Sequence, residues 1–225
     1  MLEILRTVTM SPEQWDIVVE GMRNPKNSWD RSDSYITHIE DPETLECADF
    51  EFFLGEADHA LMTSLAAGGA VHAKYRRMMP VWVTINAPLY WWKEFDTYKI
   101  GTVCNSCSTM HKIHAKPFVP EDFSRDKMTD KSMYVQDTVI DYLNACRDAF
   151  LATKDRKYWD QLIQMLPTSY NQRRTIMLSY EVLVNIYESR KHHKLEEWHT
   201  LCRWIESLPY SDLIIGKSPE NNEMV

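Results

Sequence analysis

The chain has 225 residues, of which 44% are hydrophobic, 26% are charged and only 6 are glycine. This composition excludes collagen-like, low-complexity and wholly disordered proteins. Its formal net charge of −8 has the wrong sign for a protein that holds long nucleic acid by counterion release, so an anionic ligand would have to be small and locally bound.

The first half of the chain predicts two helices and one strand. A capping-box sequence, Ser-Pro-Glu-Gln, begins at Ser11 and predicts a helix over about residues 12–23. Residues 26–54 are polar and rich in turn formers, so we expect loops with short strands there. A second helix is expected over residues 56–67, and alternating apolar residues predict a strand over residues 81–87.

The second half predicts mostly helices. Apolar residues recur at helical spacing over residues 132–151, and a shorter helical pattern follows over residues 158–166. We expect a third long helix over about residues 172–190. A final amphipathic helix is expected over residues 195–205 and is closed by Pro209.

These elements predict a single domain of the α/β (α+β) class. A modest, mostly antiparallel sheet is expected to pack against long helices over residues 1–217. Residues 218–225 are expected to form a flexible C-terminal tail.

The cysteines and the apolar stretches indicate a soluble, cytoplasmic protein. The five cysteines are odd in number and unevenly spread, and no charged-then-apolar leader precedes them, so we expect reduced thiols. The longest nearly apolar stretch, residues 80–92, is too short to span a bilayer.

A basic cluster flanks the predicted strand in this otherwise acidic chain. Arginine and lysine side chains hold small phosphorylated ligands, so the cluster is a candidate phosphate pocket. The alternative is a solvated face paired with surface carboxylates. Its members are Lys74, Arg76, Arg77, Lys93 and Lys99.

Four residues of the types that bind zinc lie within eleven positions: Cys104, Cys107, His111 and His114. Tetrahedral zinc sites use thiolates and imidazoles, but closed structural sites usually take their ligand pairs from separate elements. The segment therefore predicts either a small zinc site or buried thiols with exposed histidines.

An aromatic run follows the predicted strand, with Tyr90, Trp91 and Trp92 before Phe95 and Tyr98. Such residues could stack on a planar ring such as a flavin, a pterin or a base, and core packing explains them equally well. The common nucleophile, nucleotide-loop and zinc-protease motifs are missing from the sequence. The residues alone therefore favour a small anionic ligand and a planar ring.

Residues 61–99 resemble the flavin-dependent thymidylate synthases in the order of their motifs. That family has a Gly-His motif, then a strand that ends in Lys-Ala-Pro, and an Arg-His-Arg signature eight residues later. Here Gly69 and His72 precede the strand, Pro88 ends it, and the signature positions fall on Thr97-Tyr98-Lys99. Only Lys99 keeps a charge at these positions.

The resemblance continues after residue 99 and again in the C-terminal half of the chain. The second part of the family signature corresponds to Thr102, Cys104-Asn105, Cys107-Ser108 and the residues up to His111. In the C-terminal half, Leu166-Pro167, Tyr170 and a helix with Leu183 match the family's order. Within that helix, Asn185 and Arg190 fall on flavin-contacting and nucleotide-contacting positions.

This resemblance implies a thymidylate synthase-like α/β fold, a homotetramer with sites at subunit interfaces, and FAD beside a pyrimidine deoxynucleotide. It implies transfer of a one-carbon unit from methylenetetrahydrofolate to C5 of dUMP or a related base, with NADPH as reductant. The degraded signature suggests a divergent member. Two alternatives remain open: a non-catalytic or regulatory descendant of the same fold, and a small zinc protein.

The resemblance also implies roles for individual residues. Cys107 and Ser108 are catalytic candidates, with Cys107 either an activated nucleophile or a hydrogen-bonding group. Lys99, Ser108 and Arg190 are expected to bind substrate. The residues expected to bind cofactor are His72, Lys74, Arg76, Arg77, Thr97, Tyr98, Lys99, Asn105 and Asn185.

Overall fold

The computed structural model of the chain describes residues 1–40 and 47–216. Its centre is a four-stranded sheet in which every pairing is antiparallel. The strand order is β1 (Glu3–Val8), β4 (Pro80–Pro88), β6 (Asn171–Ser179), β5 (Thr102–Ser106). A separate hairpin pairs β2 (Tyr35–Glu40) with β3 (Cys47–Phe53).

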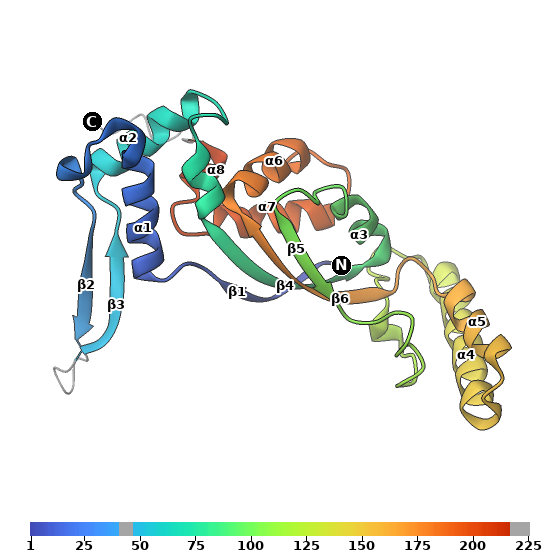
Figure 1. Cartoon of the computed structure of the whole chain (residues 1–225). Coiled ribbons are helices and arrows are strands. Elements are labelled where there is room, and N and C mark those ends of the chain that lie inside the picture. The colour runs from blue at the N-terminus through green and yellow to red at the C-terminus, as the bar shows by residue number, and fades with distance from the viewer. Residues whose placement is uncertain (41–46, 217–225) are drawn as a thin grey trace.

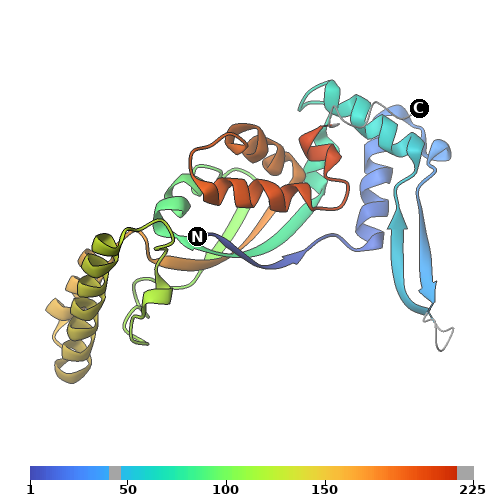
Figure 2. The ribbon, with the colours of Figure 1, turned by 180° about the vertical axis from the view of Figure 1, so that it is seen from behind.

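The helices lie on one side of the central sheet and at its two ends (Figure 1). The helices α3, α6 and α7 cover one face, α1 and α2 pack near the hairpin at one end, and the pair α4 and α5 projects from the other end (Figure 2). The bounds are α1 Pro12–Arg23, α2 Glu56–Ala67, α3 Leu89–Phe95, α4 Asp130–Thr153, α5 Arg156–Met165, α6 Tyr180–Arg190, α7 Glu196–Glu206 and α8 Asp212–Ile215.

The main core lies between the sheet and these covering helices. Val81, Val83 and Ile85 of β4 are at most 1% exposed and belong to the same buried cluster as Trp91 and Trp198. A second, smaller apolar cluster joins α4 and α5 to residues 113–123. The predicted α/β class with an antiparallel sheet is confirmed, and a single domain over residues 1–217 stays a prediction.

Several predicted elements are confirmed. The capping box at Ser11 is formed, because the Ser11 hydroxyl accepts from Gln14 N and Gln14 Oε1 accepts from Ser11 N. The predicted helices at residues 56–67, 132–151, 158–166 and 195–205 correspond to α2, α4, α5 and α7, and the predicted strand is β4. The predicted tail over residues 218–225 lies outside the described residues.

The predicted long helix over residues 172–190 is wrong in its first half. Asn171–Ser179 forms β6, which pairs with β4 along its whole length. Gln172, Ile176 and Leu178 are buried, whereas Arg173 and Thr175 between them are exposed, which is the period of a strand. Burial of this alternating face against the covering helices, together with pairing to β4 and β5, outweighs helix propensity, and α6 begins only at Tyr180.

Three further elements differ from the prediction. The strands β1 and β5 have no predicted counterpart, and the aromatic run forms the helix α3. By contrast, the loops with short strands expected over residues 26–54 are confirmed, because this segment contains a hairpin whose strands have six and seven residues. Both β1 and β5 lie at an edge of the central sheet and are largely exposed, so their sequences lack a buried apolar face.

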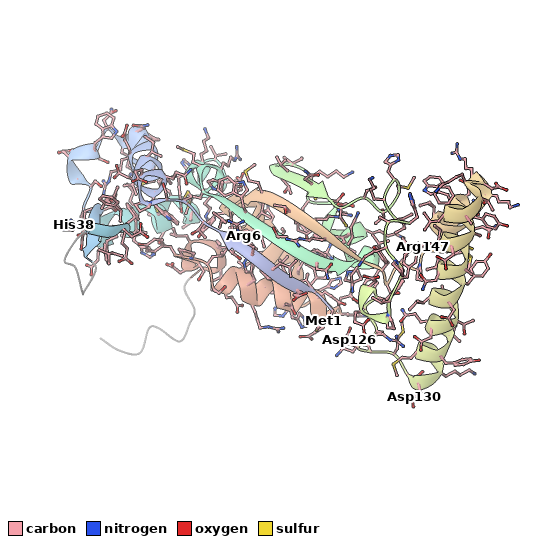
Figure 3. All side chains as sticks on the ribbon, turned by 90° about the horizontal axis from the view of Figure 1, so that it is seen from below. Met1, Arg6, His38, Asp126, Asp130 and Arg147 are labelled. Carbon is pink, nitrogen blue, oxygen red and sulfur yellow. The ribbon has the colours of Figure 1, made fainter. Side chains whose placement is uncertain are left out.

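The second face of the central sheet carries no helix in the part of the chain that the structure describes (Figures 1 and 2). Figure 3 views this side, with Arg6 of β1 between the hairpin, marked by His38, and α4, marked by Asp130 and Arg147. Within residues 1–40 and 47–216, we find no helix with both the length and the apolar character needed to cross a bilayer.

Candidate active site

Arg190, at the end of α6, is surrounded by side chains from α3, α7 and the adjoining turns. Its Nε donates to the Tyr98 hydroxyl at 2.9 Å, and its Nη1 lies 3.2 Å from Glu94 Oε2. The guanidinium stacks 4.5 Å from the Trp198 ring centroid. Glu94 Oε2 also accepts from Trp198 Nε1 at 2.9 Å and lies 3.4 Å from His193 Nε2. We call these five residues the Arg190 cage.

The Arg190 cage leaves the guanidinium partly accessible. The side chain of Arg190 is 19% exposed and that of Glu94 is 36% exposed. The carboxylate of Glu94 occupies part of the surface that an anionic ligand would use. A bound anion would therefore have to compete with this carboxylate for the guanidinium.

The segment at the family's signature positions lies along α6. Tyr98 contacts Arg190 at one end, and Gly101 approaches Val182 at the other. Gly101 has a φ of 76°, and a Cβ there would lie 3.1 Å from the Val182 side chain, so glycine suits this close approach. The segment therefore flanks the same helix that carries Asn185 between Val182 and Arg190.

The remaining predicted residues of this region have simple environments. Thr97 donates a hydrogen bond from its hydroxyl to the Glu94 carbonyl oxygen at 2.7 Å, which closes the end of α3. Lys99 and Asn185 are both exposed. The Lys99 ammonium and the Asn185 amide can therefore contact a ligand without disrupting buried contacts.

The predicted basic cluster divides between two surfaces. Arg77 Nε donates to Glu181 of α6 at 2.5 Å, with 57% of the Arg77 side chain exposed. His72 and Lys74 are exposed on the segment before and within the short 3-10 helix η3, Lys74–Met78. Arg76 points elsewhere, because it lines a cavity beside α2, α6 and α8.

Asn105 lies on the opposite side of the sheet from Asn185. In the sheet Asn105 is paired with Thr175, which in turn faces Thr84. The neighbouring Ile176 is buried toward the helices, so the alternation of side chains turns Thr175 and Asn105 toward the uncovered face. One copy of the chain therefore does not bring Asn105 and Asn185 to one site.

Cys107 and Ser108 follow the far end of β5. The Cys107 backbone N–H donates to the Arg173 carbonyl at 2.9 Å, and the Cys107 carbonyl accepts from Gln172 Nε2 at 2.8 Å. The Ser108 hydroxyl oxygen accepts from the backbone N–H groups of Met110 and His111. Both side chains are exposed, and the Ser108 hydroxyl already has a structural role in this turn.

The comparisons with known proteins identify the fold. No protein-family model and no curated protein matches the sequence. Two crystal structures of the thymidylate synthase ThyX from Helicobacter pylori with FAD and dUMP match this structure. The first has a TM-score of 0.63, 15% identity and coverage of 95% of both chains, and the second has 0.60, 14% and coverage of 94% and 95%.

A third match is the UMP/dUMP methylase PolB from Streptomyces cacaoi bound with 5-Br dUMP. Its TM-score is 0.56 at 14% identity, and the match covers 92% of this chain and 88% of PolB. The chain has the flavin-dependent thymidylate synthase fold. At this level of identity the likeness concerns the fold, and individual residues have to carry any functional argument.

The positions of the cysteine and histidine side chains do not support the zinc alternative. Among residues 1–40 and 47–216, no group of three or more histidine, cysteine or acidic side chains could hold a metal ion. Cys104 and Cys107 are exposed free thiols, and the His114 ring packs edge-on against Phe150 at 4.9 Å. The segment after β5 runs along the surface, so the cysteine and histidine pairs do not converge.

Most of the aromatic run packs in the core of the flavin-dependent thymidylate synthase fold. Trp91 and Trp92 are 0% exposed and Phe95 is 2% exposed, so core packing explains these three rings. Tyr98 is partly exposed and packs edge-on against Trp198 with ring centroids 6.0 Å apart. Among these rings, Tyr98 is the one placed beside the candidate site.

Sequence reasoning missed three polar residues of this region. Glu94 and His193 belong to the Arg190 cage, and Glu181 pairs with Arg77. Glu181 and Arg190 lie nine residues apart on one helix, but their partners are distant in sequence. Each is an ordinary polar residue in the sequence. The packing of α3 against the end of α6 gives Glu94 and His193 their partners, and the packing of η3 against α6 gives Glu181 its partner.

Proposed function

We propose that the chain is a divergent flavin-dependent enzyme that transfers a one-carbon unit from methylenetetrahydrofolate to C5 of a pyrimidine deoxynucleotide, with dUMP as the first candidate and NADPH as reductant. Structures with this fold contain FAD with dUMP, or 5-Br dUMP. The main support in this chain is that the Thr97–Lys99 segment lies along the helix that bears Asn185 and Arg190.

The residues beside α6 suit a flavin and a nucleotide in chemical type. The exposed Asn185 amide offers both a donor and an acceptor, as the edge of a flavin ring requires. The Arg190 guanidinium and the exposed Lys99 ammonium suit a nucleotide phosphate. A bound flavin would supply the hydride chemistry, and the protein's groups would bind and orient the two ligands.

Flavin retention is the direct test of this proposal. Purified protein is mixed with FAD, desalted and examined between roughly 350 and 500 nm, where an oxidised flavin absorbs. We expect a retained flavin spectrum for the wild-type chain and a reduced one for Asn185→Ala. The control variant Ser189→Ala changes an exposed residue one turn after Asn185 on α6. It should retain flavin like the wild type. A wild-type chain that keeps no flavin would contradict the proposal.

The separation of Asn105 from Asn185 supports a shared site in a homotetramer. The uncovered sheet face presents apolar side chains, with Val103 62% and Val8 41% exposed. Phe50 of the separate hairpin is also 53% exposed. Exposed apolar side chains of this kind are compatible with a subunit interface. A shared site requires one copy to present its uncovered face, which carries Asn105, to the helix-covered side of another copy, which carries Asn185.

Complementation between two weak variants tests the shared site. Asn105→Ala and Arg190→Ala chains are co-expressed with different tags, and the mixed oligomers are isolated. If each site takes these residues from two copies, random mixing should restore about a quarter of the sites to wild-type composition. We therefore expect activity at low dUMP well above that of either variant alone. Activity no higher than the mean of the two variants would place both residues in one copy's site.

One observation favours a second candidate, a non-catalytic descendant of the same fold. Arg77 and Arg190 each contact a carboxylate of the chain itself, Glu181 and Glu94 respectively. Such internal neutralisation would be expected where anion binding has been lost. This candidate predicts that neither FAD nor dUMP binds. Either candidate is compatible with a cytoplasmic location and reduced thiols. Free thiols are found at Cys104, Cys107, Cys146 and Cys202.

A further inference from the structure

A cavity of about 310 Å³ lies beside α2, α6 and α8. None of the residues of the Arg190 cage lines this cavity. Its walls are mainly aliphatic, with Ala66 and Ala67 from α2, Val184 from α6, and Leu213 and Ile215 from α8. A largely apolar cavity of this volume with a few polar groups is the usual form of a small-molecule site.

Arg76 supplies this cavity with a cation that has an unsatisfied hydrogen-bond donor. Its Nε is buried and has no hydrogen-bond partner. In the described part of the chain, no carboxylate forms an ion pair with Arg76, whereas the adjacent Arg77 is paired with Glu181. A buried donor of a charged group favours any ligand that brings an acceptor to it.

The two carboxylates that line the same cavity already have partners. Glu188 lies 2.9 Å from Lys191 Nζ, and Asp212 lies 2.5 Å from His59 Nε2. Among the described residues that line the cavity, Arg76 is therefore the cation whose buried donor still lacks an acceptor. A ligand with two negative charges would be repelled by Glu188 and Asp212, so a single negative charge fits best.

We propose that this cavity binds a small monocarboxylate with an apolar body, whose carboxylate accepts from Arg76 while the aliphatic walls cover the body. A cavity of about 150 Å³ holds one benzene ring, so about twice that volume suits a chain of roughly eight carbons. This proposal does not rest on the proposed function. It assigns Arg76 to this cavity instead of to a flavin.

Octanoate is the probe, with octan-1-ol and octylammonium as matched compounds of neutral and positive charge. Isothermal titration of the full chain should give saturable binding of octanoate at one site, and tighter binding than either matched compound. Arg76→Gln should weaken octanoate roughly 10- to 100-fold, the loss expected for one charge-assisted hydrogen bond. Arg156→Gln, an exposed arginine on α5 with an 82% exposed side chain, should bind like the wild type.

A second variant tests the same cavity in case Arg76→Gln does not fold. Ala66→Phe fills the cavity without changing charge and should abolish binding of octanoate while α-helical circular dichroism is retained. Equal binding of octanoate and octan-1-ol, or unchanged octanoate binding by both variants, would overturn the proposal. Flavin retention by Arg76→Gln is measured in parallel. Lost octanoate binding with retained flavin supports the cavity site, and lost flavin with unchanged octanoate binding contradicts it.

Discussion

Replacing Asp58 with alanine is expected to lower the free energy of unfolding by about 3–5 kcal/mol, the usual cost of removing one partner of a buried ion pair. Asp58 is 0% exposed, and its carboxylate accepts from Arg23 Nε and from the hydroxyls of Ser32 and Ser34. The change leaves Arg23, 3% exposed, with Ser28 as its remaining hydrogen-bond partner. Urea unfolding followed by circular dichroism measures the loss.

Two control variants separate the buried pair from the helix around it. Glu56→Gln changes an exposed carboxylate in the same first turn of α2 and should change stability by less than about 0.5 kcal/mol. Arg23→Met should cost less than Asp58→Ala, because the Asp58 carboxylate keeps neutral donors from Ser32 and Ser34. An Asp58→Ala protein as stable as Glu56→Gln would show that this network contributes nothing.

The same carboxylate predicts a pH dependence of stability. Burial raises the pKa of Asp58, but hydrogen bonds from Ser34, Ser32 and Arg23 outweigh it and hold the pKa below its ordinary value of 3.8. Because the folded pKa is the lower one, this stabilisation is fully present above about pH 4 and is lost as the pH falls through the folded value. Asp58→Asn should show a flatter stability profile below pH 4 than the wild type.

Replacing Arg190 with alanine is expected to raise the KM for dUMP by roughly 10- to 100-fold, since a charge-assisted hydrogen bond contributes about 1.5–3 kcal/mol. The expectation follows from the proposed function and from the position of Arg190 beside Tyr98 at the end of α6. Steady-state kinetics with varied dUMP measures it. The kcat should fall less than kcat/KM, because the lost contact concerns binding of the phosphate.

Glu94→Gln is the matched test of whether Arg190 is available to a ligand. The glutamine can still accept from Trp198 Nε1, but it no longer neutralises Arg190. If the guanidinium binds the nucleotide phosphate, this variant should bind dUMP several-fold more tightly than the wild type. Unchanged dUMP binding by both Glu94→Gln and Arg190→Ala would mean that the Arg190 cage is structural and that the nucleotide site lies elsewhere.

The sequence determines the elements whose signals are local. The helix α1 follows from the Ser11 capping box, and β4 follows from the alternation of Val81, Val83 and Ile85, which the structure buries. The fold class and the resemblance to flavin-dependent thymidylate synthases were also predicted from the order of glycine, strand, proline and C-terminal helix along the chain, and the structure matches that fold at 15% identity. Local signals suffice here because caps and periodic faces involve residues within one or two turns.

Only the tertiary structure decides β6 and the composition of the site. Asn171–Ser179 is a strand because β4 and β5 pair with it on both sides. The register of β5 turns Asn105 away from the face that carries Asn185. Glu94 meets Arg190 across 96 positions of the chain. Strand partners, the side of a sheet and the counter-ion of an arginine all depend on contacts distant in sequence, which no local pattern of residues specifies.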